Sequence, residues 1–492
     1  MNRSGGTTHF VSSVIIQRRA KASLLIPRDT FPGNSRGIRT MTNARRFIQL
    51  SLSCMALLSS TVAQAALSAH LARGERIVEL PVPGRSAEVC VIPKHFPDAA
   101  YSDNDLKAEI QLCSIDEYTN AAVCPKTNST NPGLDFYSLP QGFSSQQVEA
   151  AHCKTPGAKK IAKYKLSTSC SYTSSILGYY HLSRMLGGIA NVPPAVLRTV
   201  DRQNHVALGR TAQGETAPSS LIHQTWSALL AQLAASAGAS KRDFLLTDDF
   251  TQSYGALSVN PTNEQFYKEF FNGGSNNLAR AVTFRDKNQI VAMLARPADV
   301  STFVGRTFTT DNVQTMVQLK DAADLIVIDT LMNQQDRFGN IHYLETYYYR
   351  DTTDLNPEGS ARLKSSRTLM PAEAAKVGAV QVRQILLKDN DCGVDKQNIA
   401  QQAGLVNRIA HIDPITYRGV LHLDAIADST ATRTFFLQEL VFTANDYAGV
   451  RRNLKNLAVT LHQRCAQGGL KPDLDLQGHF SDRPLKHQSC DL

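Results

Sequence analysis

Two short polar stretches in the second half of the chain hold the side chains best suited to chemistry. The stretch "NQQDRFGNIHY" begins at residue 333 and places Asp336 and Asn340 four residues apart, directly after the apolar run "LIVIDTLM". The stretch "LLKDND" closes a second apolar run and contains Asp389. Phosphoryl transfer needs these types of group, namely a carboxylate that handles the acceptor hydroxyl and oxygen ligands for a divalent metal.

Phosphoryl transfer from ATP also needs a cation that contacts the phosphates, and a segment in the first half of the chain can supply it. The stretch "KKIAKYKLST", residues 159–168, alternates polar and apolar residues in the manner of a β-strand. It offers Lys163 or Lys165 as the phosphate-contacting residue, and the pattern leaves both open.

Regular elements are predicted around these residues and would hold them rigidly. A helix over 312–333 is apolar on most faces in its later half, which predicts a buried helix with Asp336 just beyond its end. A strand over 380–387 would deliver Asp389 in the same way. Four other elements are predicted, namely a helix at 174–188 in which His181 is a packed side chain, a proline-marked loop and hairpin at 191–210, a helical insertion at 219–238 and a polar surface loop at 351–366.

The two halves of the chain differ in pattern, which predicts an α+β fold of two lobes. Residues 156–262 are rich in strand patterns and would form an N-lobe that carries the helical insertion. Residues 263–492 would form a helical C-lobe. Residues 66–155 are rich in Cys, Pro, Ser and Asn, and they are predicted to form an irregular, Cys-containing N-terminal region with short strands such as residues 87–93.

The first 65 residues are predicted to be a leader. They hold nine of the 52 Lys and Arg residues and one of the 43 Asp and Glu residues, so the remainder is close to neutral and offers nucleic acid no electrostatic site. Residues 41–65 show basic residues, an apolar stretch and then "AQA", the pattern of a secretory signal peptide. Residues 1–40 would then be a mis-called extension. After signal cleavage no run is long enough to span a membrane, and the protein is expected in a periplasm or outside the cell.

Cysteine usage fits export. One of the nine cysteines, Cys54, would leave with the signal peptide, and an even number remains, which suits disulfides in an oxidising compartment. No Cys-x-x-Cys pair occurs and no His stands at zinc-ligand spacing, which argues against a structural zinc. One pairing is predicted, Cys392 with Cys465.

The motifs together resemble a known family. The run "SILGYYHLSRMLGGIANVPPAVLRT", residues 175–199, with "DRFGN" and "LLKDND" downstream, is similar to the secreted kinases of the Golgi casein kinase and four-jointed group. The resemblance spans about residues 160–470 and is concentrated in these motifs. It implies the atypical protein-kinase-like fold that this group shares with HipA-like and phosphoinositide kinases.

The resemblance also implies roles for single residues. Asp336 would be the catalytic carboxylate, Asp389 and Asn340 would be the metal ligands, and Lys163 would contact the phosphates. The cofactors would be ATP and Mg or Mn.

Two departures from the family pattern bear on activity. In the family, the helix that corresponds to 174–188 supplies a Glu that pairs with the lysine or helps to bind metal, and this helix contains no acid. Glu149 is one candidate substitute. Many relatives also place the Asn five residues after the catalytic Asp, whereas Asn340 is four residues after Asp336.

The sequence leaves open functions of more than one class. The first is an exported, metal-dependent phosphotransferase that moves the γ-phosphate of ATP to a hydroxyl of a protein Ser or Thr or of a glycan. The second is a pseudokinase, a binding module without turnover, and a further alternative is a kinase-fold enzyme that transfers another group such as AMP. Hydrolase motifs such as Gly-x-Ser-x-Gly and His-Glu-x-x-His are absent. No oligomeric state is predicted.

Overall fold

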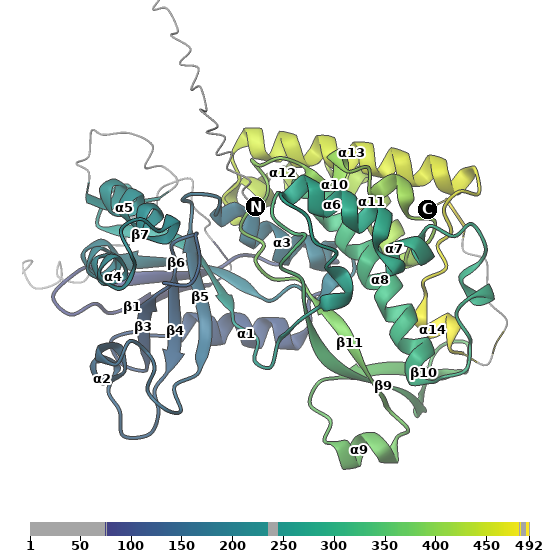
Figure 1. Ribbon diagram of the computed structural model, residues 1–492, viewed down its shortest axis with the longest axis horizontal. Coiled ribbons are helices and arrows are strands. Elements are labelled where there is room, and N and C mark those ends of the chain that lie inside the picture. The colour runs from purple at the N-terminus through teal and green to yellow at the C-terminus, as the bar shows by residue number, and fades with distance from the viewer. Residues whose placement is uncertain (1–73, 75, 235–244, 482, 484–488, 492) are drawn as a thin grey trace, which may run out of the picture. The chain divides into compact units, whose positions relative to one another are not determined.

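The computed structural model of the chain describes residues 74, 76–234, 245–481, 483 and 489–491. The predicted extension and signal peptide, residues 1–40 and 41–65, lie outside these residues. The strands of the first sheet come from the first half of the described chain, and helices dominate the second half (Figure 1). The predicted α+β fold, with a strand-rich first lobe and a helical second lobe, is confirmed.

An antiparallel sheet of seven strands forms the first lobe, in the order β1-β2-β6-β7-β5-β4-β3. The sequence places residues 66–155 in an irregular region ahead of the lobe, whereas β1 to β4 of that region supply both edges of the lobe's sheet. The strands are β1 (Arg76–Leu80), β2 (Glu88–Ile92), β3 (Ala121–Pro125), β4 (Leu134–Ser138), β5 (Lys160–Leu166), β6 (Ala195–Asp201) and β7 (Gln252–Val259).

Strand β5 shows how periodicity assigns side chains to the two faces of this sheet. Ala162, Tyr164 and Leu166 are fully buried in one hydrophobic core. Because successive residues of a strand point to opposite faces, Lys163 and Lys165 share the other face. The strand predicted at 159–168 is therefore present, and it presents both lysines on the same side.

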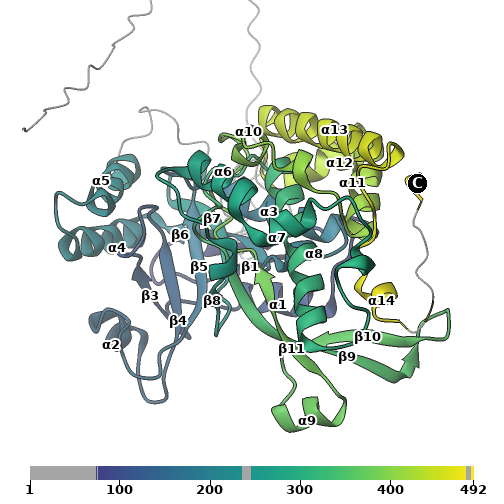
Figure 2. The same ribbon diagram turned by 45° about the vertical axis from the view of Figure 1, so that its right-hand side comes forward.

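Helices cover both faces of the sheet. On the face of Lys165, α3 (Thr173–Met185) packs against β6 and β7 within a core shared with the second lobe. On the opposite face, α4 (Arg202–Glu215) and α5 (Leu221–Ala234) lie side by side and bury Trp226 (Figure 2). The two remaining helices of this lobe are α1 (Asp103–Cys113), which contacts β2 and β6, and α2 (Ser145–Ala150), which contacts β3.

The hairpin predicted within 191–210 is wrong, because β6 runs directly into α4. Asp201 ends the strand, and its side chain accepts a hydrogen bond from the backbone N–H of Asn204 (2.9 Å), which caps the helix. His205 and Ala212 then recur at helical spacing on the buried side of α4. The two-residue repeat of the strand therefore ends at Asp201, and the helical repeat begins after it.

The second lobe is built around α8 (Thr310–Leu331), in which every residue from 321 to 331 is buried. The predicted buried helix is confirmed. No helix among the described residues is long and apolar enough to cross a membrane. The other helices of this lobe are α6 (Asn277–Lys287), α7 (Gln289–Leu294), α9 (Pro371–Lys376), α10 (Ile399–Gln402), α11 (Pro414–Ile426), α12 (Thr430–Thr434), α13 (Ala444–Ala466) and α14 (Leu476–His479).

A second, smaller sheet belongs to this lobe. Its order is β10-β9-β11, and the short β8 pairs with the start of β9. Residues 351–366, predicted to be a surface loop, instead form most of the β9–β10 hairpin, in which Lys364 pairs with Asp351 (2.7 Å). Opposite charges across two strands stabilise a hairpin that has no apolar alternation. The strands are β8 (Gln265–Phe266), β9 (His342–Leu355), β10 (Ala361–Ser366) and β11 (Val380–Leu386).

Four disulfides join the cysteines of the described chain. The predicted pairing of Cys392 with Cys465 is wrong, because Cys392 pairs with Cys170 across a sequence separation of 222 residues. The other three bridges are local and are Cys90–Cys113, Cys124–Cys153 and Cys465–Cys490. The long-range bridge ties the segment after β5 to the segment after β11.

Candidate active site

A polar cleft of about 360 Å³ lies between the two lobes. Its walls come from β5, the β3–β4 loop, the loop after α8 and the loop after β11. All five residues singled out in the sequence line it, and they are Lys163, Lys165, Asp336, Asn340 and Asp389. Asp336 and Asp389, more than fifty residues apart in the sequence, therefore line the same cleft.

Asp389 is held in an unusual backbone conformation beside Asn340. Its φ of 55° lies in the left-handed region, which Asp tolerates better than most residues. One carboxylate oxygen accepts a hydrogen bond from the side-chain amide of Asn340, and the other lies 3.8 Å from Nζ of Lys165. The spacing of four residues in "DRFGN" thus brings Asn340 to Asp389.

The lysines of the cleft keep Asp389 ionised. Burial acts to raise the pKa of its carboxyl group, but Lys165, Lys163 and Lys126 outweigh burial and hold that pKa below its usual range. A charged carboxylate at this position can bind a metal cation without first losing a proton.

Lys165, rather than Lys163, is the lysine paired with a carboxylate. Its Nζ lies 2.7 Å from Asp391, the last residue of "KDND", and Asp391 also accepts a hydrogen bond from the side chain of Asn131 (3.3 Å). Asp391 thereby supplies the acid that α3 lacks. Glu149 does not, because its carboxylate accepts a hydrogen bond from the backbone N–H of Val123 and lies outside the cleft lining.

Arg337, next to Asp336, fixes the two acidic loops to each other. It is 1% exposed, and its guanidinium donates to Asp329 of α8 (2.9 Å), to the side-chain oxygen of Asn390 (2.6 Å) and to the backbone carbonyl of Lys388 (2.6 Å). A planar guanidinium with several donors suits such a junction. Its contacts set the position of Asp336 relative to the Asp389 loop.

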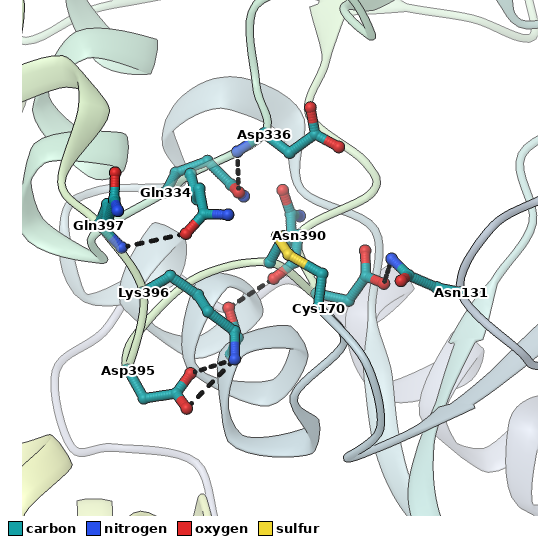
Figure 3. Close-up of a disulfide and its surroundings, with 12 residues drawn as sticks. Asn131, Cys170, Gln334, Asp336, Asn390, Asp395, Lys396 and Gln397 are labelled. Atoms are coloured by element: carbon teal, nitrogen blue, oxygen red, sulfur yellow. Dashed lines mark hydrogen bonds and ion pairs between the residues drawn. A yellow bond between two sulfur atoms is a disulfide. The ribbon is translucent and has the colours of Figure 1, made fainter. Parts of the chain in front are cut away.

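Backbone bonds and the long-range disulfide reinforce this junction. The N–H of Gln335 donates to the carbonyl of Cys392 (2.9 Å), and the hydroxyl of Ser175 on α3 donates to the carbonyl of Asn390 (2.6 Å). Figure 3 shows the Cys170 disulfide in one neighbourhood with Asp336, Asn390 and Asn131, which come from three different segments.

Asp336 itself is exposed and has no ion-pair partner within the described part of the chain. Its backbone N–H donates to the side-chain oxygen of Gln334 (3.1 Å), which fixes the main chain and leaves the carboxylate free. An unpaired carboxylate at the mouth of a polar cleft is available to a hydroxyl group of a ligand.

The donor set fits a metal bound together with phosphates. Over the described residues, no cluster of three or more His, Cys, Asp or Glu side chains could enclose an ion. Mg²⁺ in kinase sites takes one or two carboxylates and completes its shell with phosphate oxygens and water. Asp389 and the amide oxygen of Asn340 match that modest requirement.

Several residues of the cleft were not identified from the sequence. They include Lys126, Asn131 and Lys388, two of which lie on the β3–β4 loop. The loop sequence "KTNSTNPG" between two short strands is a hairpin signal of turn-forming residues, and it could have indicated the loop.

A narrow apolar pocket continues from the cleft. Ile176, Pro193, Val259 and Pro261 line it together with the lysines of β5. Its volume of about 40 Å³ is far below that of pockets that hold nucleotide-sized ligands.

No protein-family model and no curated protein matches the chain. Solved structures of the Golgi casein kinase with Mn/ADP bound (13% identity, TM-score 0.38, covering 73% of this chain and 76% of that one) and of the Golgi casein kinase (13%, 0.39, 75% and 79%) are similar to it. The structure of hydra Fam20 with sugar is also similar (11%, 0.39, 74% and 90%). Two of these three structures are of the Golgi casein kinase, a member of the group that the sequence motifs resemble.

Proposed function

We propose that the protein is a metal-dependent phosphotransferase that moves the γ-phosphate of ATP to a hydroxyl group. The observation that supports this most is the single cleft that joins the unpaired carboxylate of Asp336, the ionised Asp389 with Asn340, and the lysines of β5. These groups provide the three requirements of phosphoryl transfer, which are acceptor handling, metal ligands and phosphate contacts.

Each residue has a defined task in binding. Lys163 contacts phosphate oxygens with its unpaired ammonium group, while Lys165 stays with Asp391 and braces the loop of Asp389. Asp389 and Asn340 would hold Mg²⁺ or Mn²⁺. When bound, the ion neutralises charge on the phosphate oxygens.

Transfer proceeds at the mouth of the cleft. Asp336 accepts a hydrogen bond from the acceptor hydroxyl, which orients its oxygen toward the γ-phosphorus. A new O–P bond forms as the bond to the leaving ADP oxygen breaks, and the hydroxyl proton passes to Asp336 and then to solvent. The acceptor is a Ser or Thr of a protein, or a hydroxyl of a glycan.

The experiment uses the full chain with its disulfides intact, incubated with ATP and Mn²⁺. Phosphate release or self-labelling is expected, and Asp336→Asn should lower the rate by about 10²- to 10⁴-fold while ATP still binds. An unchanged rate in Asp336→Asn, or a wild-type protein that binds no ATP, would refute the proposal. The mass of the labelled product distinguishes a transferred phosphate from a transferred AMP.

A second candidate function is nucleotide binding without turnover, because Asp391 replaces only the pairing with lysine and α3 still carries no acid that could help to bind metal. In that case the wild type would bind ATP and Mn²⁺ but release no phosphate. The same titration and assay on one preparation separate the two functions.

We also propose that the protein is exported. The four disulfides support this because such bonds persist in oxidising compartments. N-terminal sequencing of the protein recovered from the periplasm or the medium should begin near residue 66. Recovery only from the cytoplasm, with free thiols, would contradict export.

A further inference from the structure

Five lysines line the cleft, and they fall into two groups by their partners. Three are neutralised by carboxylates, in the pairs Lys160–Asp135, Lys165–Asp391 and Lys388–Glu264. In the part of the chain that the structure describes, the ammonium groups of Lys126 and Lys163 have neither a carboxylate at ion-pair distance nor a hydrogen bond. The cleft therefore holds two ammonium groups without a direct carboxylate contact, and Asp389 attracts both through space.

Lys126 is the less expected of the two, because its backbone is held in place while its ammonium group has no partner. It begins the loop between β3 and β4, and its N–H donates to the carbonyl of Gly133 (2.9 Å). Its own carbonyl accepts a hydrogen bond from the indole N–H of Trp226 (3.0 Å). Trp226 is fully buried on α5 and is the only tryptophan of the chain. The helical insertion thus fixes where Lys126 stands.

The Lys126 side chain is half-buried while its ammonium group still reaches solvent, so burial penalises the charge only in part. Burial, with Lys165 nearby, lowers the pKa of Lys126 to about 8. An anion that bound beside Lys126 would remove that penalty, and the cleft has room for one between the β3–β4 loop and Asp389.

We propose that Lys126 binds the phosphate end of a polyphosphate ligand, and that Trp226 is the positioning residue that holds Lys126 there through its carbonyl. This inference rests on the proposed function, since it assigns a further contact to the nucleotide of that same cleft. The ligand class is a linear triphosphate, whether free or part of a nucleoside triphosphate.

The first experiment titrates Mn²⁺-tripolyphosphate and Mn²⁺-ATP into the wild type, Lys126→Met and Lys107→Met by calorimetry. Lys107 is an exposed lysine on α1, outside the cleft lining, so its replacement is a matched control for loss of one charge. Lys126→Met should weaken both triphosphates by about 10- to 100-fold, because a hydrogen bond to a charged group is lost. Lys107→Met should bind as the wild type does.

The second experiment tests the role of Trp226. Trp226→Phe keeps a ring in the core but removes the N–H donor, and it should weaken tripolyphosphate binding less than Lys126→Met does. In the double variant Trp226→Phe/Lys126→Met, binding should equal that of Lys126→Met alone, because Trp226 acts through Lys126. Additive losses would overturn the positioning role. If Trp226→Phe does not fold, the fluorescence of Trp226 in the wild type, which should change on tripolyphosphate binding and not in Lys126→Met, tests the same link.

The outcomes separate this inference from the proposed function. Equal affinity of Lys126→Met and the wild type for both triphosphates overturns the inference and leaves the phosphotransferase intact. A wild type that binds tripolyphosphate with loss in Lys126→Met, but transfers no phosphate, supports the inference and refutes the proposed reaction. Binding of ATP but not of tripolyphosphate would place the affinity in the nucleoside and would also overturn the inference.

Discussion

The junction at Arg337 offers a stringent test of how the two acidic loops are held together. Arg337→Met keeps much of the side-chain volume but removes every donor, so the carboxylate of Asp329 loses its buried partner and, among the described residues, retains only the hydroxyl of Tyr179 (2.7 Å). Breaking a buried pair by removing one partner costs about 3–5 kcal/mol. The carbonyl of Lys388 and the side-chain oxygen of Asn390 also lose their donor. We therefore expect a loss toward the upper end of this range.

The pH dependence of that loss follows from Asp329. Burial raises the pKa of its carboxyl group even with Arg337 present, and removing Arg337 must raise it further. Below the unfolded pKa both states are protonated and the variant has no charge to bury. As the pH rises, the unfolded chain releases the proton first in both proteins, and the variant continues to lose stability after the wild type has stopped, because its folded pKa is higher. The deficit should be smaller near pH 5 than near pH 7.5.

The assay is equilibrium urea unfolding followed by far-UV circular dichroism at both pH values. Arg337→Met/Asp329→Asn should recover part of the lost stability, since no buried charge remains. Arg362→Met is a matched control, because Arg362 pairs with Asp354 at the surface and exposed pairs contribute little. A deficit below about 1 kcal/mol, or one that neither pH nor Asp329→Asn reduces, would refute the role given to Arg337.

Three further perturbations probe other parts of the fold. Replacing both Cys170 and Cys392 by Ser should lower the free energy of unfolding by about 2–5 kcal/mol and weaken ATP binding. An unchanged midpoint of thermal unfolding under non-reducing conditions would contradict this. Burial lowers the pKa of His205 from 6.5 to about 3, so the unfolded chain takes up a proton first and stability should fall by about 1.4 kcal/mol per unit as the pH drops below 6.5. His205→Asn should lose less stability than the wild type between pH 7 and pH 5. An added Cβ at Gly393 would lie 2.8 Å from the carbonyl oxygen of Met332, so Gly393→Ala should cost about 1–3 kcal/mol, whereas Gly214→Ala, with open space around it, should not destabilise.

The elements that the sequence predicted well are long or strongly periodic. The buried helix α8 and the strands β5 and β11 each carry an apolar pattern that tertiary contacts only reinforce. The predicted residues meet in one cleft because these elements end beside each other, and Asp336 and Asp389 follow directly on two of them.

What the sequence did not predict depends on contacts between distant residues. The order of β1 to β4 in the sheet was not predicted, because each is five residues long and takes its place by pairing with later strands. The pairing of Cys170 with Cys392 requires the approach of two loops that no spacing encodes. The hydrogen bond from Trp226, on a helix of the opposite face, to the carbonyl of Lys126 likewise joins residues 100 positions apart.

The disulfide connectivity has a consequence for biosynthesis. Along the described chain the cysteines pair first with second, third with fourth, fifth with sixth and seventh with eighth. A translocating chain that emerges from its N-terminus, and is oxidised as each thiol appears, would reach this set without reshuffling. Only Cys170 has a distant partner, and its thiol stays unpaired until the 222nd residue after it, Cys392, has emerged. In a chain exported as proposed, the bridge beside the cleft would form after most of the polypeptide has crossed, and an oxidase that acts on thiols in order of arrival would suffice for the native pairing.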